Sequence, residues 1–440
     1  MMQPTFCTTF SFTLAALLFS ISISYANAFS YSHGIFHLNY RTVQVYNNGE
    51  QYCKNLALLR LSKTDTNGNM EENDAKNKIN VGIAGAGAVA YATTSILATR
   101  GHNPMIWSPS GKSTSGLTLL TSYGAIEYEF QPRIATDAQQ LVESNTVIIL
   151  TLPANGHIQI MNSIAPFIKS DQIIIISSHS SLGAVYLTQL LAERGVSIPI
   201  IAWGTTIATA RKLSNSSVQV CTVRTLVDMC TVPTTQTDVG LETCQNLFGE
   251  RFKLRDGLLA ISLSNLNAQN HLGIALGNMS RMERGEKWSQ GLNLTPNIGR
   301  LLEALDRERL EIANILNLNV RTIYEHFQLS FHVPISSVSE MNQAMVAKGN
   351  DVNGPDTPNS RYVTEDVPYG LTLIVALGRL VGRPAVLHEA GIEIVSAMYG
   401  KDFWSENGLL NALRLEEFGI EDVRRAGETG VLMKEEVVNM

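Results

Sequence analysis

Three small residues early in the chain have a spacing that suits the binding of a phosphate group. Gly85, Gly87 and Ala90 fit the pattern G-x-G-x-x-[GA]. The first glycine permits a tight turn, the second lets the backbone approach a pyrophosphate, and the small third residue lets a helix pack on a strand. An apolar run precedes the pattern and an Ala- and Leu-rich segment starting at Ala88 follows it. Because strand, turn and helix are expected in that order, the sequence predicts a dinucleotide site at Gly85, Gly87, Ala88 and Ala90.

The end of the second predicted strand, residues 103–107, bears on the choice between NADP and NAD. An acidic residue about 20 positions past the glycines accepts hydrogen bonds from the 2′-hydroxyl of NAD. The segment from Ser108 to Ser113 has no carboxylate and contains Lys112. We therefore expect NADP as the cofactor, with NAD as the alternative, and place Ser108 and Lys112 beside the ribose. The other interpretation is a solvated loop in which Lys112 is a surface charge.

A further predicted strand, residues 146–151, leads into a second cofactor-side segment. It ends at Thr151, and Pro153 follows two residues later. Small polar residues at the carboxyl ends of strands line the cofactor crevice of such a sheet. We therefore predict that Thr151 and Pro153, together with Ser178 at the end of the strand at 171–178, lie near the nicotinamide.

A polar helical face carries the imidazole best suited to proton transfer. Asn267, His271 and Asn278 are spaced i, i+4 and i+11, which puts them on one face of a helix. Taken alone, a histidine of this kind is more often structural than functional.

A second polar cluster combines a guanidinium with a carboxylate. Arg361 and Asp366 follow a loop rich in Gly, Asn, Asp and Pro and precede a helical pattern that starts at Leu371. An arginine suits bidentate binding of a carboxylate. The alternative interpretation is structural: Asp366 would cap the helix that follows, and Arg361 would form an ion pair at the surface.

Two domains are expected to position these residues. Apolar runs and helical patterns alternate over 78–258, including runs at 171–178, 198–202 and 217–223, as a doubly wound parallel sheet requires. Helical spacing of Leu and Ala dominates 259–430. The predicted fold class is therefore an α/β Rossmann domain followed by an all-α substrate domain, with a flexible tail at 431–440.

The N-terminal residues have the features of a targeting sequence. Residues 10–23 are apolar, and Ala26-Asn27-Ala28 has the small-x-small form of a cleavage site, so we expect a signal peptide at 1–28. The polar residues 29–77 are predicted to be a largely disordered presequence or linker. The junction at Phe29 resembles the bipartite plastid presequences of algae with secondary plastids. This predicts entry into the secretory pathway, to a plastid or to the outside, with no membrane segment left after signal removal.

Composition argues against several partners. The 440 residues carry a formal net charge of −6 without a basic block, which argues against nucleic acid. Histidines and carboxylates show no ligand spacing such as H-E-x-x-H, so no metal is implied.

The residues from Arg361 to Ala385, RYVTEDVPYGLTLIVALGRLVGRPA, resemble the octopine/nopaline, or opine, dehydrogenase family. The glycine pattern, the Asn-rich approach to His271 and the run from Leu302 to Arg309 extend the resemblance to about 78–420. It implies a Rossmann domain plus a helical substrate domain.

The resemblance also implies roles for three residues. The catalytic histidine falls on His271, its partner aspartate on Asp366, and the arginine that holds a substrate carboxylate on Arg361. The implied reaction condenses a 2-oxo acid with an amino acid and reduces the imine with hydride from the nicotinamide.

Two other functions remain open from the sequence. One is a 2-hydroxyacid or ketopantoate-type reductase that uses the same residues without an amine. The other is a dinucleotide-binding sensor without turnover, which would be favoured if His271 and Asp366 lay far apart. A homodimer through the helical domain is also compatible with the sequence.

Overall fold

The computed structural model describes residues 78–434. The predicted signal peptide (1–28), the predicted linker (29–77) and residues 435–440 of the predicted tail lie outside the described residues. Targeting therefore stays a prediction. Within the predicted tail, Leu432 is buried, three residues after the end of the last helix.

A mainly parallel eight-stranded sheet forms the first part of the described chain. Its strand order is β12-β11-β8-β7-β6-β1-β2-β5, and every pair is parallel except β8 with β11. The central strands are continuous apolar runs, as expected where both faces of a sheet are covered. Its strands are β1 (Asn80–Ala84), β2 (Asn103–Trp107), β5 (Arg133–Ile134), β6 (Val147–Leu150), β7 (Ile173–Ile176), β8 (Ile200–Trp203), β11 (Val227–Val232) and β12 (Phe252–Leu254).

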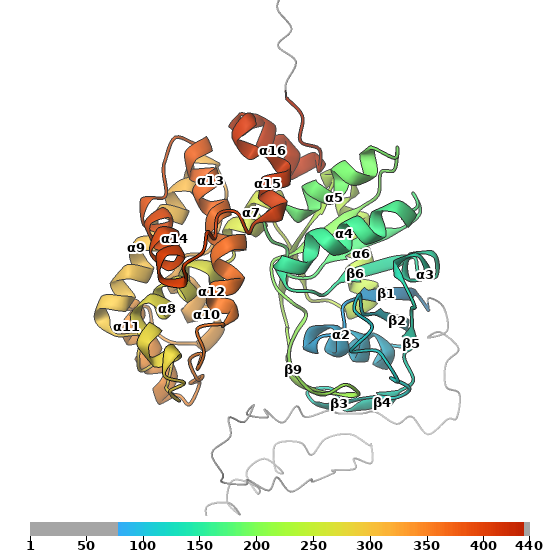
Figure 1. Cartoon of the computed structure of the whole chain (residues 1–440), viewed down its shortest axis with the longest axis horizontal. Helices are drawn as coiled ribbons and strands as arrows, with labels where there is room; N and C mark the ends of the chain where they lie inside the picture. Colours follow the sequence, from blue (N-terminus) through green and yellow to red (C-terminus); the bar gives the residue numbers. More distant parts are fainter. Residues whose placement is uncertain (1–77, 435–440) are drawn as a thin grey trace, which may run out of the picture. The chain divides into compact units, whose positions relative to one another are not determined.

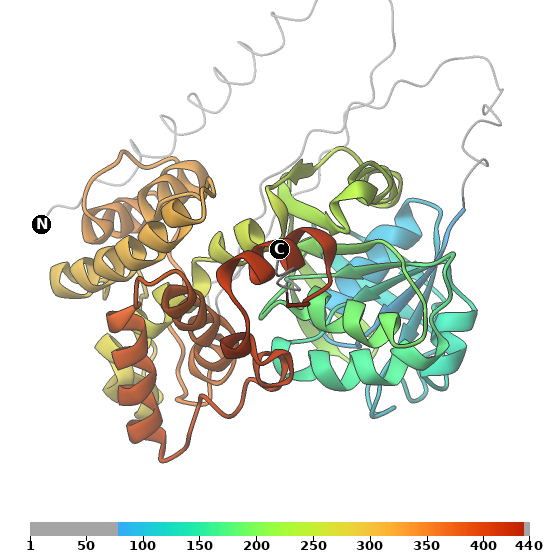
Figure 2. The same ribbon diagram turned by 90° about the horizontal axis from the view of Figure 1, so that it is seen from above.

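Helices cover both faces of this sheet (Figure 2). Ile148 and Ile174 share one apolar cluster with side chains of α3 (Ala138–Glu143), α4 (His157–Ile164) and α5 (Gly183–Ala192). The neighbouring Ile149 and Ile175 point the other way, into a cluster with α2 (Ala88–Thr99) and α6 (Thr237–Phe248). Alternate side chains of one strand therefore build two separate cores, and the predicted doubly wound fold is confirmed.

A second, four-stranded sheet was not predicted. Its order is β4-β3-β10-β9, and it shares the apolar cluster of α2 (Figure 1). The strands are β3 (Leu120–Gly124), β4 (Tyr128–Phe130), β9 (Ala208–Ser214) and β10 (Ser217–Val223). The expectation that 217–223 belongs to the doubly wound sheet is therefore wrong, because β10 pairs with β3 and β9 instead.

Helices account for the rest of the described chain, starting three residues after β12. The α-helices are α7 (Gly257–Leu263), α8 (Asn267–Glu283), α9 (Pro296–Ile315), α10 (Ile323–Phe331), α11 (Val338–Ala347), α12 (Arg361–Thr364), α13 (Thr372–Leu380), α14 (Val386–Tyr399), α15 (Gly408–Leu413) and α16 (Ile420–Thr429). Short 3-10 turns are η1 (Ala154–Gly156), η2 (Ala165–Phe167), η3 (Thr234–Gln236) and η5 (Leu415–Glu417), and η4 (Val367–Leu371) is a π-helical turn. Between residues 78 and 434, no helix combines the length and apolarity needed to cross a membrane.

A buried ion pair on α9 ties the helical part together. Asp306 and Arg309 are 2% and 0% exposed and lie 2.7 Å apart, from Oδ1 to Nη2. The Asp306 carboxylate also accepts from Gln269 Nε2 at 2.8 Å and from the amide of Ile323 at 2.9 Å. Arg309 donates to the carbonyl of Leu263. The pair thereby links α7, α8, α9 and the start of α10.

Replacing the carboxylate of this pair should destabilise the helical part strongly. Asp306→Ala leaves the Arg309 guanidinium buried without a counter-charge, so we expect a loss of about 3–5 kcal/mol in the free energy of unfolding. Urea titration followed by far-UV circular dichroism measures it. Glu421→Ala removes a carboxylate from an exposed pair with Arg424 and should leave the midpoint unchanged. Equal midpoints for the two variants would contradict this role of Asp306.

Candidate active site

The glycine turn between β1 and α2 has the geometry that its sequence requires. Gly85 has φ +129°, and its amide donates to the carbonyl of Trp107 at 2.8 Å. A Cβ at Gly85 would lie 2.7 Å from Thr151 Oγ1, so only glycine fits there. Ala90 is fully buried against the sheet.

The space beyond this turn suits a bound phosphate. A Cβ built on Gly87 would meet nothing within 4 Å. Gly87 is also the N-cap of α2; no side chain caps this end of the helix, and no acidic residue lies in its first turn. The backbone amides at the start of α2, beginning with that of Ala88, and the positive end of the helix dipole are therefore available to an anion.

The other predicted cofactor residues have different environments. Ser108 is 8% exposed at the end of β2, whereas Lys112 is exposed on the loop that follows. Thr151 Oγ1 donates to the carbonyl of Ala84 at 3.0 Å, so this hydroxyl holds β6 to β1. Pro153 is exposed and precedes η1.

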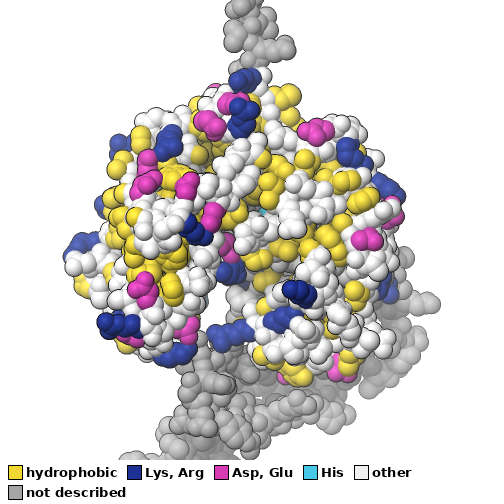
Figure 3. Space-filling view, viewed as in Figure 1, with side chains coloured by type: hydrophobic (Ala, Val, Ile, Leu, Met, Phe, Trp, Pro, Cys, Tyr) yellow, Lys and Arg dark blue, Asp and Glu magenta, His cyan; other side chains and the backbone are white. Residues whose placement is uncertain are grey.

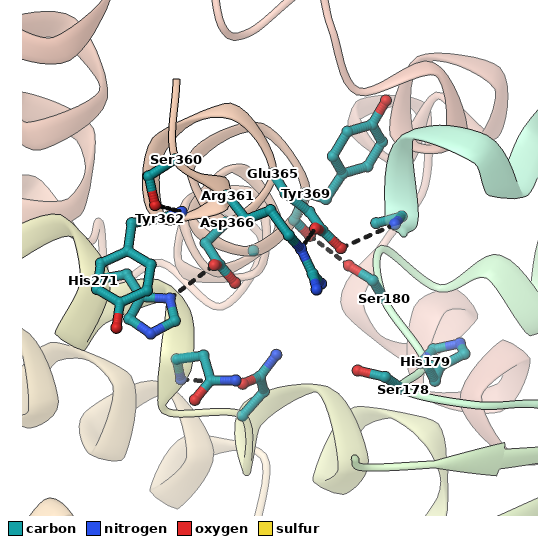
Figure 4. Close-up of a pocket in the computed structure, with 14 residues that line it drawn as sticks. Ser178, His179, Ser180, His271, Ser360, Arg361, Tyr362, Glu365, Asp366 and Tyr369 are labelled. Atoms are coloured by element: carbon teal, nitrogen blue, oxygen red, sulfur yellow. Dashed lines mark hydrogen bonds and ion pairs between the residues drawn. The ribbon is translucent and has the colours of Figure 1, made fainter. Parts of the chain in front are cut away.

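A cavity of about 360 Å³ gathers the catalytic candidates. Of the residues predicted beside the nicotinamide, Ser178 lines this cavity, whereas Thr151 and Pro153 do not. Figure 4 shows His271, Arg361 and Asp366 together at this cavity, with Ser178 and Ser180 from the sheet side. The lining is mostly polar, and consists of Ala154, Ser178, His179, Ser180, Asn265, Asn267, His271, Ser360, Arg361, Tyr362, Glu365, Asp366, Tyr369 and Gly370.

His271 lies in the first turns of α8 and is held on two sides. Its Nδ1 is 2.7 Å from Asp366 Oδ2, and both side chains are 19% exposed. An ionised carboxylate only accepts, so Nδ1 carries the proton and Nε2 is left free to exchange one. The imidazole also stacks on the Tyr362 ring, with centroids 3.5 Å apart and an interplanar angle of 9°.

Tyr362 is itself fixed as a neutral phenol. Its hydroxyl donates to Gln290 Oε1 at 2.8 Å. Burial, together with the charge of Asp366, raises the pKa of Tyr362 to about 12. The ring therefore restrains the orientation of His271 without adding a charge beside it.

Arg361 begins α12, whose N-cap Ser360 accepts from the amide of Tyr362 at 3.3 Å. Its Nε is paired with Glu365, but its side chain is 71% exposed. Glu365 is 12% exposed and also accepts from the amide of Ala154 at 3.0 Å. The ion pair that the sequence allowed for Arg361 therefore exists, and it lies at the edge of the cavity.

The π-helical turn η4 starts directly after Asp366, and side chains donate to its backbone carbonyls. Ser180 Oγ and Ser181 Oγ donate to the carbonyl of Tyr369 at 2.8 and 2.6 Å. Asn407 Nδ2 donates to the carbonyl of Pro368 at 2.8 Å and to Ser181 Oγ at 3.0 Å. These bonds fix the turn that carries Asp366 against the loop after β7.

His179 is not arranged as a base for Ser180. It is 3% exposed, and its Nε2 accepts from the amide of Ala184 at 3.2 Å. Burial, with a smaller contribution from the nearby His157, lowers the pKa of His179 to about 3. Since Ser180 donates to Tyr369 instead, the two residues do not form a nucleophile pair.

Sequence reasoning missed Tyr362, Glu365, Asn265 and the π-helical turn. Tyr362 and Glu365 lie within the segment that carried the resemblance, and this position in the motif was the available signal.

Comparison with known proteins finds opine dehydrogenases among the relatives of this chain. Residues 254–399 match the family described as NAD/NADP octopine/nopaline dehydrogenase, alpha-helical domain. The chain is 27% identical over 355 residues to an opine dehydrogenase of Arthrobacter sp. (strain 1C), covering 79% of this chain and 98% of that protein. It is 25% identical to Protein ocs of Agrobacterium tumefaciens (strain Ach5), with the same coverage of both chains.

Solved structures agree on the fold. An octopine dehydrogenase in complex with NADH and agmatine superposes with a TM-score of 0.65 at 17% identity, covering 80% of this chain and 96% of that one. A yersinopine dehydrogenase with NADP+ bound gives 0.58 at 13% identity, covering 77% and 99%. The match over residues 254–399 and the curated relatives confirm that the chain resembles the octopine/nopaline dehydrogenase family, and the solved structures support the shared fold.

Proposed function

We propose that this protein is an NAD(P)H-dependent, opine dehydrogenase-like oxidoreductase that condenses a 2-oxo acid with an amino acid and reduces the imine. The observation that carries the proposal is the 2.7 Å contact of His271 Nδ1 with Asp366 Oδ2 at the cavity that Arg361 also lines. A dinucleotide-binding sensor without turnover is disfavoured, because a histidine that is oriented by an aspartate and has a free Nε2 is suited to proton transfer.

The glycine turn would hold the dinucleotide. The open space at Gly87 and the uncapped start of α2 fit its phosphates, and the absence of a carboxylate from Ser108 to Ser113 favours NADP over NAD. When bound, the nicotinamide supplies the hydride.

His271 moves the protons of the condensation. Its Nε2 takes a proton from the substrate ammonium, which frees the nitrogen lone pair to attack the carbonyl carbon of the oxo acid. In the adduct a second proton passes from the nitrogen to the former carbonyl oxygen, which becomes a hydroxyl. The protonated ring gives its proton to this hydroxyl, which leaves as water, and the nitrogen keeps its one remaining proton in a protonated imine. Asp366 holds the ring through Nδ1 and stabilises its positive charge between these steps.

Arg361 would hold the oxo acid by its carboxylate. Its Nε is engaged by Glu365, while no residue among 78–434 is bonded to its two Nη groups. A planar guanidinium with free donors suits a bidentate carboxylate.

The α14 helix provides a surface for the homodimer that we include in this proposal. Leu387, Ile394 and Met398 are spaced i, i+7 and i+11, and are 39%, 51% and 49% exposed. Figure 3 shows hydrophobic side chains gathered over α14. Two copies of this stripe, paired about a two-fold axis, would cover each other.

A substrate panel tests the proposed reaction. We expect oxidation of NADPH in the presence of a 2-oxo acid such as pyruvate to depend on added amino acid, with NADH a poorer donor. A 2-hydroxyacid reductase would instead turn over with the oxo acid alone.

His271→Ala should lower kcat about 10²–10⁴-fold, because the proton carrier is lost. His332→Asn changes an exposed histidine of the helical part and serves as the control. Near wild-type activity of His271→Ala would remove this mechanism.

Arg361→Met should raise the KM for the oxo acid about 10–100-fold, because a charge-assisted pair with the substrate carboxylate is removed. Steady-state kinetics with the other two substrates saturating measures this effect. Arg383→Met, which alters an exposed pair with Glu311, is the matched control. An unchanged KM in Arg361→Met would assign the carboxylate to another residue.

Ile394→Glu should convert the dimer to a monomer, because it places a charge in the centre of the apolar stripe. Size-exclusion chromatography with light scattering should show half the mass of the parent protein. Leu329→Glu, at an exposed leucine of α10, should leave the mass unchanged. A parent protein of monomeric mass would rule the dimer out.

A further inference from the structure

The second sheet brings a lysine to the glycine turn. Lys212 on β9 donates from Nζ to the carbonyl of Ala86 at 3.1 Å, and Ala86 is the residue between Gly85 and Gly87. The same ammonium lies 4.6 Å from the centroid of the Tyr91 ring on α2. A strand outside the main sheet thus adds a cation to the turn, 126 residues away in sequence.

The charge of Lys212 is not neutralised by the protein. Among residues 78–434 no carboxylate forms an ion pair with it, and the first turn of α2 has no acidic residue. The start of α2 is itself a positive dipole end. Partial burial lowers the pKa of Lys212, as expected for an ammonium without a counter-ion. The Lys212 ammonium and the positive end of the α2 dipole repel each other, so their proximity is unfavourable unless an anion lies between them.

Tyr91 holds this arrangement in place. Its hydroxyl is 2.7 Å from the carbonyl of Ser113, on the loop after β2, and 2.9 Å from the carbonyl of Asn215, between β9 and β10. Burial raises the pKa of Tyr91 to about 12, so the phenol remains a donor. The β9–β10 turn is therefore fixed to the loop where the ribose end of the cofactor is expected, and Gly87 leaves open space beside it.

We propose that Lys212 binds a phosphate group of the dinucleotide and complements the uncapped amides of α2. This assignment rests on the proposed function. The ammonium has three donors, of which Ala86 uses one. The 5′-diphosphate and the ribose 2′-phosphate share the required chemistry, and a comparison of ligands separates them.

Calorimetric titration of the full-length protein with ADP and with 2′,5′-ADP tests this assignment. Lys212→Gln keeps a donor for the carbonyl of Ala86 but removes the charge, and we expect binding about tenfold weaker. A loss confined to 2′,5′-ADP assigns Lys212 to the 2′-phosphate, and a loss that includes ADP assigns it to the 5′-phosphates. Affinities within twofold of wild type for both ligands would overturn the assignment.

Three controls accompany the titration. Lys212→Arg retains the charge and should bind within a few-fold of wild type. Lys253→Gln, at an exposed lysine of β12, should bind as wild type does. Thermal denaturation establishes that each variant is folded. A wild-type protein that binds neither ligand nor NADPH overturns the proposed function as well, whereas unchanged binding by Lys212→Gln overturns only the role of this lysine.

Discussion

The hydrogen bond between His271 and Asp366 is the contact on which the candidate site depends, because it joins segments 95 residues apart and determines which ring nitrogen is free. A single bond of this kind does not orient a side chain by itself. The stacked Tyr362 ring restrains the imidazole from its face, and the bond from Tyr362 to Gln290 restrains the ring in turn. The hydrogen bond therefore restrains the imidazole within the plane of its ring, and the stacked tyrosine restrains it perpendicular to that plane.

The position of Asp366 is set by backbone chemistry more than by its own side chain. Ser180, Ser181 and Asn407 donate to backbone carbonyls of the turn that follows it. Glu365 adds a bond to the amide of Ala154. Residues of the sheet part therefore help to place an aspartate of the helical part.

Much of this arrangement could be predicted from local patterns. The glycine turn, the strand at 103–107 and the α8 face carrying His271 follow from spacing alone, because tight turns and amphipathic periods are local properties. The second sheet could not be found that way. Its strands are partly exposed, and β3 pairs with β10 from nearly a hundred residues further along. Lys212 was missed for the same reason, and Thr151 was given a ligand-facing role although its hydroxyl is used by β1. Pairing between strands that are far apart in the sequence produces no periodic pattern of residues.

The turn at Val367–Leu371 has a consequence for how this segment tolerates length changes. A π-helical turn is equivalent to one residue inserted into an α-helix, and one residue corresponds to a rotation of about 100° about the axis. The faces of the chain before and after it are therefore offset from those of an unbroken helix. Deleting a single residue here would rotate the chain before the turn by about 100° relative to α13, and would thereby turn the aspartate away from the imidazole.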